Sequence, residues 1–483
     1  MGNLLGQPIT EKETHLGHID DLEYGVSSMQ GWRIHMEDAH ICQETLFAQE
    51  LQDDYFVSDN VNCDSGSNND MRVNFKDGTE GEDVAEEGGQ MKKARVNSNT
   101  DLKDQAAAAS QNSIPANMNT NPTATATSPK PTYKSIPVPQ HSLFAVFDGH
   151  GGSYAAHYSG LNFVRVLSRQ PSFVKYAHCL EELNGDIHAS SPKESANRTT
   201  ATNTENNDSR SPQLLAKLQR QALQWLEMAF CDAFIELDTE IYYAMHEQDS
   251  LDPDAILPPT TSSNSEGEGD TVSPLLSTTD SGTTANVVLF TPTWILCANA
   301  GDSRSIYSKS MSGNQITTPL SYDHKPEEDA ESQRIQEAGG FVRAGRVDGD
   351  LAVSRGLGDF RFKNAETVLK GTSVFKHSYK YKYGGNASTS KGEEGGRHLQ
   401  NGGVRRVTCP EDQKVSPVPD LVIQNRNRQQ DEFVVVACDG IWDVVTNQEC
   451  VDLTREIFEG GESDLGLLSE EVRICCISCE YVE

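Results

Sequence analysis

Three short apolar segments of this chain each lead into an aspartate, and this repeated pattern constrains the fold more than any other feature. The segments and their aspartates are residues 143–147 with Asp148, residues 294–298 with Asp302, and residues 433–438 with Asp439. Short continuous apolar runs are typical of buried strands, and a rigid strand fixes the direction of the side chain at its tip. One acidic strand end is an ordinary turn, but three of them, together with Glu37 and Asp38, predict oxygen ligands that meet around hard cations.

The rest of the chain combines helical and strand-like patterns. Apolar residues recur at helical spacing from Leu214 to Ile241, which predicts a long helix packed on a sheet. Pro326 at a first helical position and Gly339-Gly340 beyond the end predict a second helix from Glu327 to Ala338. Strands outnumber helices and are not joined by regular βαβ crossovers. The sequence therefore predicts an α+β fold of antiparallel sheets with helices packed outside them.

Four stretches have the composition of inserted loops. They are residues 59–137, which are acidic and then rich in Asn, Thr, Ala and Pro, and residues 185–212, 247–277 and 364–406, which are rich in Ser, Asn, Thr, Gly or Lys. Segments of this kind bury too little apolar surface to offset the entropy of the chain, so we expect them to be disordered. What remains fits one large domain better than three small ones.

The charge balance is strongly acidic. The 72 Asp and Glu outnumber the 40 Lys and Arg, for a formal net charge of −32, which argues against nucleic acid or an anionic membrane as the main partner. No apolar run approaches the roughly 18–20 residues that span a bilayer. The first six residues lack the charged and apolar regions of a signal peptide. Gly2 invites N-myristoylation, although position 6 is Gly rather than Ser or Thr.

The eleven cysteines are scattered and odd in number. This usage is typical of reduced thiols and predicts a protein of the cytoplasm or the nucleus. Cys475, Cys476 and Cys479 cluster near the end of the chain, so a zinc site must be weighed there. Structural zinc takes four ligands, and no nearby His or second Cys pair supplies the fourth. The sequence therefore disfavours zinc.

The acidic strand ends point to one kind of chemistry. Carboxylates with few His or Cys candidates favour Mg²⁺ or Mn²⁺ over Zn²⁺, and two such ions can share a hydroxide and stabilise an in-line displacement at phosphorus. Arg33, four residues before Glu37, can bind phosphate oxygens, and His150, two residues after Asp148, can protonate a leaving alkoxide. Alone, an Arg is more often a surface charge and a His more often structural. The run from Gly149 to Gly152 lacks the spacing and the Lys of a nucleotide-binding P-loop.

Seven motifs, in order along the chain, give a more specific indication. They are Gly31 to His40 (GWRIHMEDAH), Phe147 to Gly152 (FDGHGG), Asp280 to Ala285 (DSGTTA), Ala300 to Arg304 (AGDSR), Asp323 to Pro326 (DHKP), Leu351 to Asp359 (LAVSRGLGD) and Ala437 to Asp443 (ACDGIWD). With these motifs the chain resembles the type 2C (PPM) metal-dependent serine/threonine protein phosphatases, and most of all their fungal members. The resemblance implies an N-terminal segment, residues 1–22, and a phosphatase domain over residues 23–483 that the four inserts interrupt.

The resemblance also implies a fold and a metal centre. The fold would be a four-layer αββα sandwich of two antiparallel sheets flanked by helices, with the metals at one end of the sheets. Glu37, Asp148 and the carbonyl of Gly149 would hold one Mg²⁺ or Mn²⁺ ion, and Asp148 and Asp439 would hold the other. Asp38 would act on the metal-bound water.

Further positions match the family's substrate-binding and auxiliary residues. Asp302 and Asp443, together with the aspartate at 439, match those that bind a weaker third ion. Arg33 would hold the phosphate, and His150 would act as general acid. The segment from Arg343 to Asp359 would flank the cleft, without a chemical step assigned to it.

The implied activity is hydrolysis of phosphoserine and phosphothreonine on proteins by a metal-bound hydroxide, carried out by a monomer. One alternative is a catalytically impaired pseudo-phosphatase that binds phosphoproteins without turnover. Another is a metal-dependent hydrolase of small phosphate esters, which the motif set disfavours because it belongs to protein phosphatases. Comparing the turnover of a phosphopeptide with that of a small ester discriminates between these activities.

The family pattern stops early at the C-terminus. Members of the family end their core with a Gly-x-x-Asp-Asn-Met motif, whose aspartate is the last ligand of the metal shared with Asp439. Here residues 461–476 resemble the penultimate helix, and the chain ends at Glu483 without that motif. Glu480 and Glu483 lie off the motif and are poor substitutes. We expect a shortened gene model rather than a natural variant, and a 483-residue product that is unstable and less active than an extended chain. The pseudo-phosphatase alternative rests on this missing ligand.

Overall fold

The computed structural model describes residues 4–19, 22–52, 131–189, 212–246, 251–258, 280–375 and 409–480, without the side chains of 184–189 and 473–480. These residues belong to one structural unit, formed by Met1–Gln52 and Pro131–Glu483. Some sequence-based predictions fall outside the described residues: Gly2, insert residues 59–130, 190–211, 247–250, 259–277 and 376–406, the thiols of Cys475, Cys476 and Cys479, and the carboxylates of Glu480 and Glu483.

The first sheet has five antiparallel strands in the order β16-β10-β9-β6-β3. Their bounds are Asp420–Asn425 (β16), Trp294–Ala300 (β10), Ala285–Phe290 (β9), Ser142–Phe147 (β6) and Ala39–Gln43 (β3). β9 and β10 are buried along almost their whole length. Both faces of the sheet are therefore covered, which is why these strands are continuous apolar runs in the sequence.

A second sheet has three antiparallel strands in the order β12-β11-β17, and a separate hairpin pairs β1 with β2. The bounds are Asn314–Pro319 (β12), Arg304–Met311 (β11), Asp431–Ala437 (β17), Leu4–Ile19 (β1) and Leu22–Arg33 (β2). β6, β10 and β17 confirm the three apolar strands predicted from the sequence. Residues 4–19 pair with β2 along the hairpin, and the proposed boundary after residue 22 stays a prediction.

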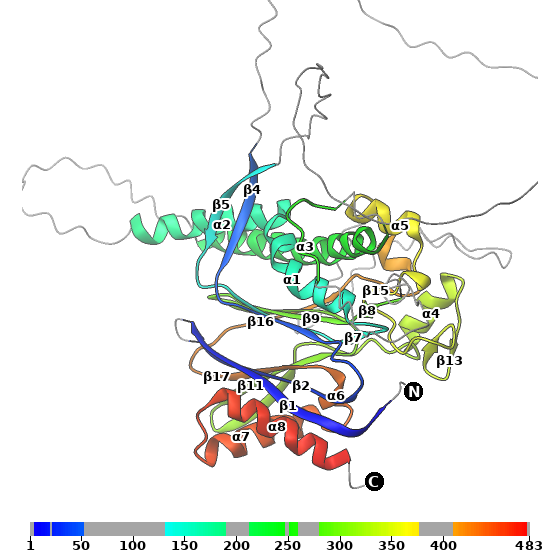
Figure 1. Ribbon diagram of the computed structural model, residues 1–483. Coiled ribbons are helices and arrows are strands. Elements are labelled where there is room, and N and C mark those ends of the chain that lie inside the picture. The colour runs from blue at the N-terminus through cyan, green and yellow to red at the C-terminus, as the bar shows by residue number, and fades with distance from the viewer. Residues whose placement is uncertain are drawn as a thin grey trace, which may run out of the picture. The chain divides into compact units, whose positions relative to one another are not determined.

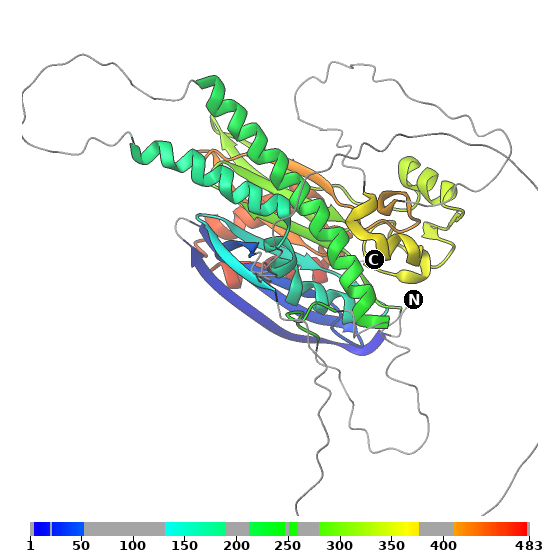
Figure 2. The same cartoon turned by 90° about the horizontal axis from the view of Figure 1, so that it is seen from above.

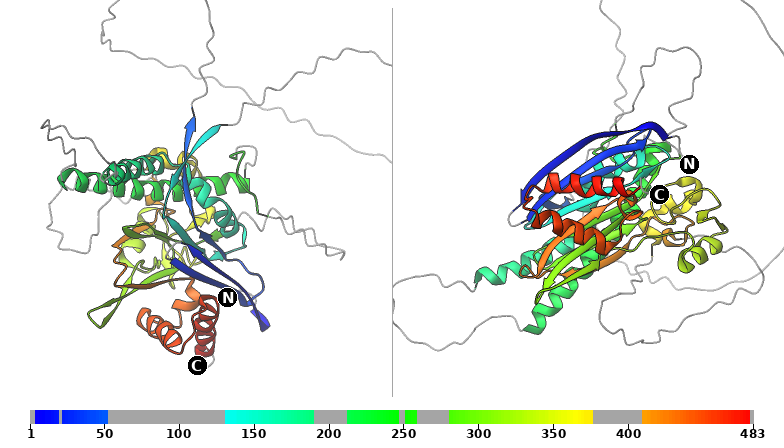
Figure 3. Two further views of the ribbon diagram at one scale, coloured as in Figure 1. Left: turned by 90° about the vertical axis from the view of Figure 1, so that its left-hand side faces the viewer. Right: turned by 90° about the horizontal axis from the view of Figure 1, so that it is seen from below.

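Five helices pack on the sheets. They are α1 (Tyr154–Ser168), α2 (Pro171–Ala189), α3 (Pro212–His246), α7 (Asn447–Glu459) and α8 (Leu465–Glu480). α3 confirms the predicted long helix and extends it at both ends. Figure 2 shows α2 and α3 running side by side above the first sheet, and Figure 3 shows α7 and α8 below the strands of the second sheet. None of the helices in the described part of the chain is long and apolar enough to cross a membrane.

The helices and sheets form four layers (Figure 1), and the packing of alternate strand side chains agrees with this arrangement. Tyr307 of β11 and Val434 of β17 pack against the first sheet, while their neighbours Ile306 and Phe433 pack in the cluster formed with α7 and α8. The opposite face of the first sheet packs against α1, α2 and α3 in the largest apolar cluster. Successive strand residues point to opposite faces, so the two sheets face each other between two layers of helices. The predicted αββα sandwich is confirmed.

Short elements cover one end of the sandwich. They are β7 (Gly149–His150), β8 (Gly282–Thr283), β15 (Leu357–Gly358), β13 (Val342–Arg343), β14 (Arg346–Val347), α4 (Asp329–Glu337), α5 (Ala365–Lys370), α6 (Asp439–Trp442) and the 3₁₀ turns Phe360–Phe362, Gly371–Val374 and Pro410–Asp412. α4 begins at Asp329 rather than Glu327, because Pro326 lies in a turn that precedes the helix.

Parts of all four inserts are ordered, contrary to the composition-based prediction, and α2 reaches Ala189 within the insert at residues 185–212. Thr132–Val138 forms β5, which pairs with β4 (Leu46–Gln52) and buries Ile136 and Val138. Residues 364–375 form α5 and a 3₁₀ turn, and residues 251–258 form a turn without helix or strand. Composition missed these elements because each is short and lies beside a long polar stretch that dominates the average.

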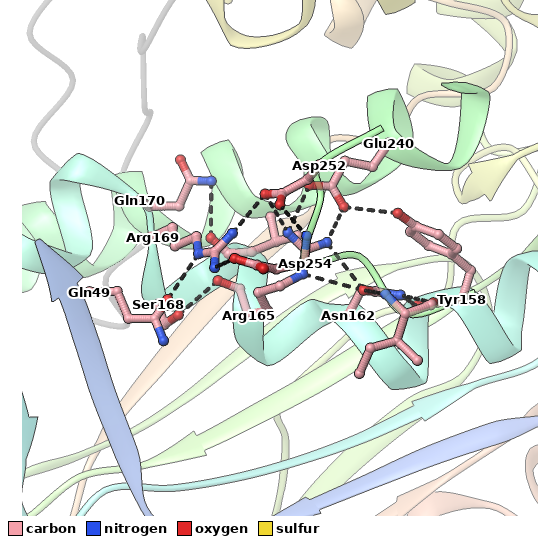
Figure 4. Close-up of polar contacts among 12 residues, drawn as sticks. Gln49, Tyr158, Asn162, Arg165, Ser168, Arg169, Gln170, Glu240, Asp252 and Asp254 are labelled. Carbon is pink, nitrogen blue, oxygen red and sulfur yellow. Dashed lines mark hydrogen bonds and ion pairs between the residues drawn. The ribbon is translucent and has the colours of Figure 1, made fainter. Parts of the chain in front are cut away.

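An arginine cluster holds the turn at residues 251–258 to α1 (Figure 4). Arg165 Nη1 and Arg169 Nη1 donate to the same oxygen of Asp252, at 3.0 and 2.7 Å. Arg169 also pairs with Asp254, and Arg165 pairs with Glu240 of α3. Asp252 thus bridges two guanidinium groups whose side chains are only 13 and 14% exposed, which explains why a segment of loop-like composition is ordered.

We expect Asp252→Ala to destabilise the fold by about 2–3 kcal/mol, because it removes a counter-charge shared by two poorly exposed guanidinium groups. The free energy of unfolding in urea measures the effect. Asp254→Ala is the matched control: its carboxylate is 40% exposed, and such a pair contributes less than about 1 kcal/mol. Equal losses in the two variants would show that Asp252 does not tie α1 to the turn.

Candidate metal and active site

The segment after β6 is held in place through its backbone. The carbonyl of Asp148 accepts from Thr284 N at 3.0 Å and from Thr283 Oγ1 at 3.1 Å, and Asp148 N donates to Thr284 Oγ1 at 3.2 Å. β7, which follows at once, pairs with β8 in the small sheet β15-β8-β7. The carboxyl of Asp148 therefore projects from a rigid strand end, as the sequence predicts.

The acidic pair Glu37 and Asp38 lies against this strand end. Gly149 N donates to Asp38 Oδ1 at 3.3 Å, and Gly152 N donates to Glu37 Oε1 at 3.0 Å. A Cβ atom at Gly149 would stand 2.0 Å from the carbonyl oxygen of Glu37. Only glycine permits this approach, which brings two carboxylates from residues 37–38 beside Asp148.

Asp439 completes a carboxyl pair with Asp148. It begins α6 at the end of β17, and its charge acts on the carboxyl of Asp148. Burial, followed by the charges of Asp38 and Asp439, raises the pKa of Asp148 well above its usual value. Burial and the charge of Asp302 raise the pKa of Asp439. Burial and neighbouring negative charges both oppose ionisation, so this pair is stabilised when a cation lies beside it.

Asp302 and Asp443 lie around Asp439. Asp302 is buried, and Lys325 Nζ donates to its Oδ2 at 2.7 Å. Asp443 is exposed and follows α6, where its N–H donates to the carbonyl of Asp439 at 2.8 Å. The charge of Asp443 raises the pKa of Asp439, as burial and Asp302 do, whereas Lys325 lowers it. Both aspartates therefore share an electrostatic environment with the central pair.

His150 faces a carboxylate that the sequence did not assign to it. Its Nε2 lies 2.9 Å from each carboxylate oxygen of Asp359. Burial alone would lower the pKa of His150, but the charge and hydrogen bonding of Asp359 raise it. His150 is thus close to the carboxylate cluster through β7 and is oriented by a residue 209 positions later in the chain.

Arg33 is the predicted site residue that no described contact ties to the cluster. It is the exposed last residue of β2, and its carbonyl accepts from Gln30 Nε2 at 2.9 Å. Among the described residues its guanidinium has no ion pair. The structure therefore brings together the predicted metal ligands and His150, and leaves the Arg33 side chain available to an anion.

The donor set has the chemistry that Mg²⁺ and Mn²⁺ require. It consists of carboxylate oxygens and the Gly149 carbonyl, which are hard donors, and its crowded negative charge is the kind that a divalent cation offsets. Within the described part of the chain, no three His, Cys, Asp or Glu side chains converge closely enough to enclose an ion as they stand. The donors fit such ions by type and by charge.

Three residues of this region were not predicted as functional. Lys325 contacts Asp302, Asp359 contacts His150, and burial and the charge of Asp38 raise the pKa of the Cys438 thiol. All three lie inside motifs that the sequence analysis singled out. Motif membership was the only available signal, since nothing local reveals a contact made across the fold.

An open hollow of about 500 Å³ lies beside the cluster. Its lining comprises Arg304 and residues 442–448. Of the carboxylates discussed above, only Asp443 borders it. The guanidinium of Arg304 donates to Asp323 at 2.7 Å and to Asn447 at 2.8 Å. These side chains already pair with the charge that Arg304 brings to the hollow.

Comparisons with known proteins agree with this geometry. The chain is 26% identical over 480 residues to "Protein phosphatase 2C homolog 3" of Schizosaccharomyces pombe, an alignment that covers 99% of this chain and 65% of that protein. It is 30% identical over 318 residues to a probable protein phosphatase 2C of Caenorhabditis elegans, covering 66% of this chain and 55% of the relative. The chain thus spans between about half and two thirds of the length of these curated relatives.

Solved structures and a family model were also compared. A serine-threonine phosphatase 2C from Toxoplasma gondii aligns at 16% identity with a TM-score of 0.43, over 71% of this chain and 83% of that one, a likeness too weak to carry an argument. The model of the family described as "Protein phosphatase 2C" matches residues 236–480, about half of the sequence. The chain therefore belongs to the protein phosphatase 2C family.

Proposed function

We propose that this chain is a metal-dependent protein phosphatase that hydrolyses phosphoserine and phosphothreonine on proteins and uses Mg²⁺ or Mn²⁺. One observation carries the proposal. In a chain of this family, Asp148 and Asp439 stand at two strand ends, Asp38 accepts from Gly149 N at 3.3 Å, and the charges of Asp38, Asp439 and Asp302 raise the pKa of Asp148. A buried group of like charges is unfavourable unless cations bind to it.

The ligand roles are those that the family resemblance implies for these residues. Glu37, Asp148 and the Gly149 carbonyl would hold one ion, and Asp148 and Asp439 the other. Asp302 and Asp443 would contribute, with Asp439, to a weaker third position. When bound, such ions stabilise charge on phosphoryl oxygens and activate water.

Asp38 would support this centre without being a main ligand. One of its oxygens already accepts from Gly149 N at 3.3 Å, and this bond orients its carboxylate. Its remaining lone pairs can accept a proton from water beside the main ligands.

The substrate roles fall to two other side chains. The Arg33 guanidinium would bind phosphate oxygens, for which its planar pair of donors is suited. His150 would hold the proton that the serine or threonine oxygen takes when its bond to phosphorus breaks. A simple alkoxide is a poor leaving group, so this proton matters more for a phosphoprotein than for a phenolic ester.

We expect turnover of a phosphoserine or phosphothreonine peptide to require millimolar Mg²⁺ or Mn²⁺, to cease in EDTA and to return when Mn²⁺ is added back. Phosphate release measures it. Binding of the phosphopeptide without turnover in Mn²⁺ would support the pseudo-phosphatase instead. Turnover of small phosphate esters alone would support the small-ester hydrolase, and activity that survives EDTA would contradict the metal-dependent mechanism.

A further inference from the structure

The contact between His150 and Asp359 has the geometry of an orienting pair. Nε2 of the imidazole lies 2.9 Å from both oxygens of the carboxylate. The Asp359 side chain is 3% exposed, whereas the His150 side chain is 26% exposed. One edge of the ring is therefore fixed against a buried acceptor while the rest of the ring remains accessible.

The backbone around Asp359 is built to hold this carboxylate in place. Asp359 has a φ of 52° and directly follows Gly358, with a φ of 79°. A positive φ is unfavourable at a non-glycine residue and is retained where the surrounding structure imposes it. Asp359 N donates to the carbonyl of Ser281 at 3.2 Å. A Cβ atom at Gly282 would stand 2.2 Å from Asp359 Oδ2, so that position leaves room for the carboxylate.

A second contact anchors the same turn to α3. Lys363 Nζ donates to Asp238 Oδ1 at 2.7 Å and to the carbonyl of Gly356 at 2.9 Å. Gly358 N donates to the same oxygen of Asp238 at 2.8 Å. Both charged side chains are buried. The backbone at Gly356 and Gly358 is thus fixed independently of His150, and the imidazole is oriented by a rigid carboxylate.

We infer that Asp359 is a positioning residue that accepts the Nε2 proton of His150 in a hydrogen bond and leaves Nδ1 as the nitrogen that serves the substrate. The described residues provide no hydrogen-bond partner for Nδ1. This inference rests on the proposed function and deepens it, because it names the atom that transfers the proton and the residue that selects it.

The proton count is balanced. In the doubly protonated ring, Nε2–H donates a hydrogen bond to the Asp359 carboxylate, and Nδ1–H donates to the ester oxygen. As the oxygen of water bonds to phosphorus, Asp38 takes a proton from that water. The ester bond breaks, its bonding electrons go to the serine or threonine oxygen, and that oxygen takes the Nδ1 proton. The ring is left neutral with its proton on Nε2. An aspartate fixes the tautomer of a catalytic histidine in this manner in other hydrolases.

The experiment has a spectroscopic readout and a kinetic one. In the ¹⁵N-histidine-labelled full chain with Mg²⁺, we expect the His150 signals, assigned by their loss in His150→Ala, to show the Nε2–H tautomer when the ring is neutral. Asp359→Asn places an amide that can donate to Nε2 and should shift the population toward Nδ1–H. A predominantly Nδ1–H ring in the unmodified protein would overturn the inference, whether or not any variant folds.

The kinetic readout compares leaving groups. Asp359→Asn should lower kcat for a phosphoserine peptide by about 10–100-fold and kcat for p-nitrophenyl phosphate by less than about threefold, because the phenolate needs no proton. His150→Ala should show the same selectivity, and the double variant should add little to it. Asp350→Asn, an exposed carboxylate on the same segment, is the control and should change neither substrate.

The possible outcomes separate the two proposals. Equal losses on both substrates in Asp359→Asn, at an unchanged unfolding midpoint, would show that Asp359 acts on the fold alone. A chain that turns over neither substrate but shows the Nε2–H tautomer and its shift in Asp359→Asn would overturn the proposed function and keep the pairing. Turnover of the phosphopeptide, together with a tautomer that does not shift in Asp359→Asn, would keep the proposed function and overturn the pairing.

Discussion

Asp148→Asn is expected to remove nearly all phosphatase activity while leaving the metal-free fold at least as stable as the parent. The carboxylate of Asp148 would be shared between both ions, and an amide carries no charge to hold them. Loss of a group that merely orients a metal ligand already lowers activity or affinity about 10–100-fold, so we expect more than about 100-fold here. The measurements are kcat/KM on a phosphopeptide at saturating Mn²⁺ and Mn²⁺ affinity by titration calorimetry.

The stability half of this prediction distinguishes a lost ligand from a damaged fold. In EDTA, Asp148 is crowded by the carboxylates of Asp38, Asp302 and Asp439, and burial raises its pKa further. A neutral side chain of the same size relieves this repulsion, so the unfolding midpoint should stay or rise. Asp329→Asn, an exposed carboxylate on α4, is the matched control for charge and should retain activity. Activity within a few-fold of the parent would rule out a bridging role for Asp148.

The strand ends show what could be predicted from the sequence. β6, β10 and β17 are apolar because they are sandwiched between layers, and such burial leaves a pattern that survives in the sequence without any knowledge of partners. The location of the acidic side chains at their tips was predictable for the same reason, since the end of a rigid strand fixes where the next side chain lies. The long helix α3 was predictable from its periodicity.

Other features could not be predicted because they depend on contacts across the fold. β5 lies at the end of a long polar insert, and only its pairing with β4 and the burial of Ile136 distinguish it. Asp359 belongs to a recognised motif, yet its contact with His150 joins residues 209 positions apart. Lys325 reaches Asp302 in a similar way. The sequence contains these residues, and the geometry that gives them a role arises only when the layers assemble.

Asp238→Ala is expected to lower the free energy of unfolding by about 3–5 kcal/mol, the largest stability effect among these predictions. Asp238 lies on α3, and its Oδ1 accepts from Lys363 Nζ at 2.7 Å and from Gly358 N at 2.8 Å. The Lys363 side chain is 0% exposed and that of Asp238 is 2% exposed. The variant would leave an ammonium group and a backbone donor buried without their shared acceptor, and such groups are costly to desolvate. Urea denaturation in EDTA, followed by circular dichroism, measures the loss.

A compensating variant tests whether the cost comes from the uncompensated charge. Asp238→Leu combined with Lys363→Met removes both charges and replaces them with apolar groups, which is often close to neutral for buried pairs. Gly358 N would still lack its acceptor, so we expect recovery of most but not all of the lost stability. Because the same turn carries Asp359, the double variant should also lose more turnover of the phosphoserine peptide than of the phenolic substrate, as a loosened Asp359 predicts. A single variant within about 1 kcal/mol of the parent would mean that water or a rearranged partner already satisfies Lys363, and that α3 does not anchor the turn.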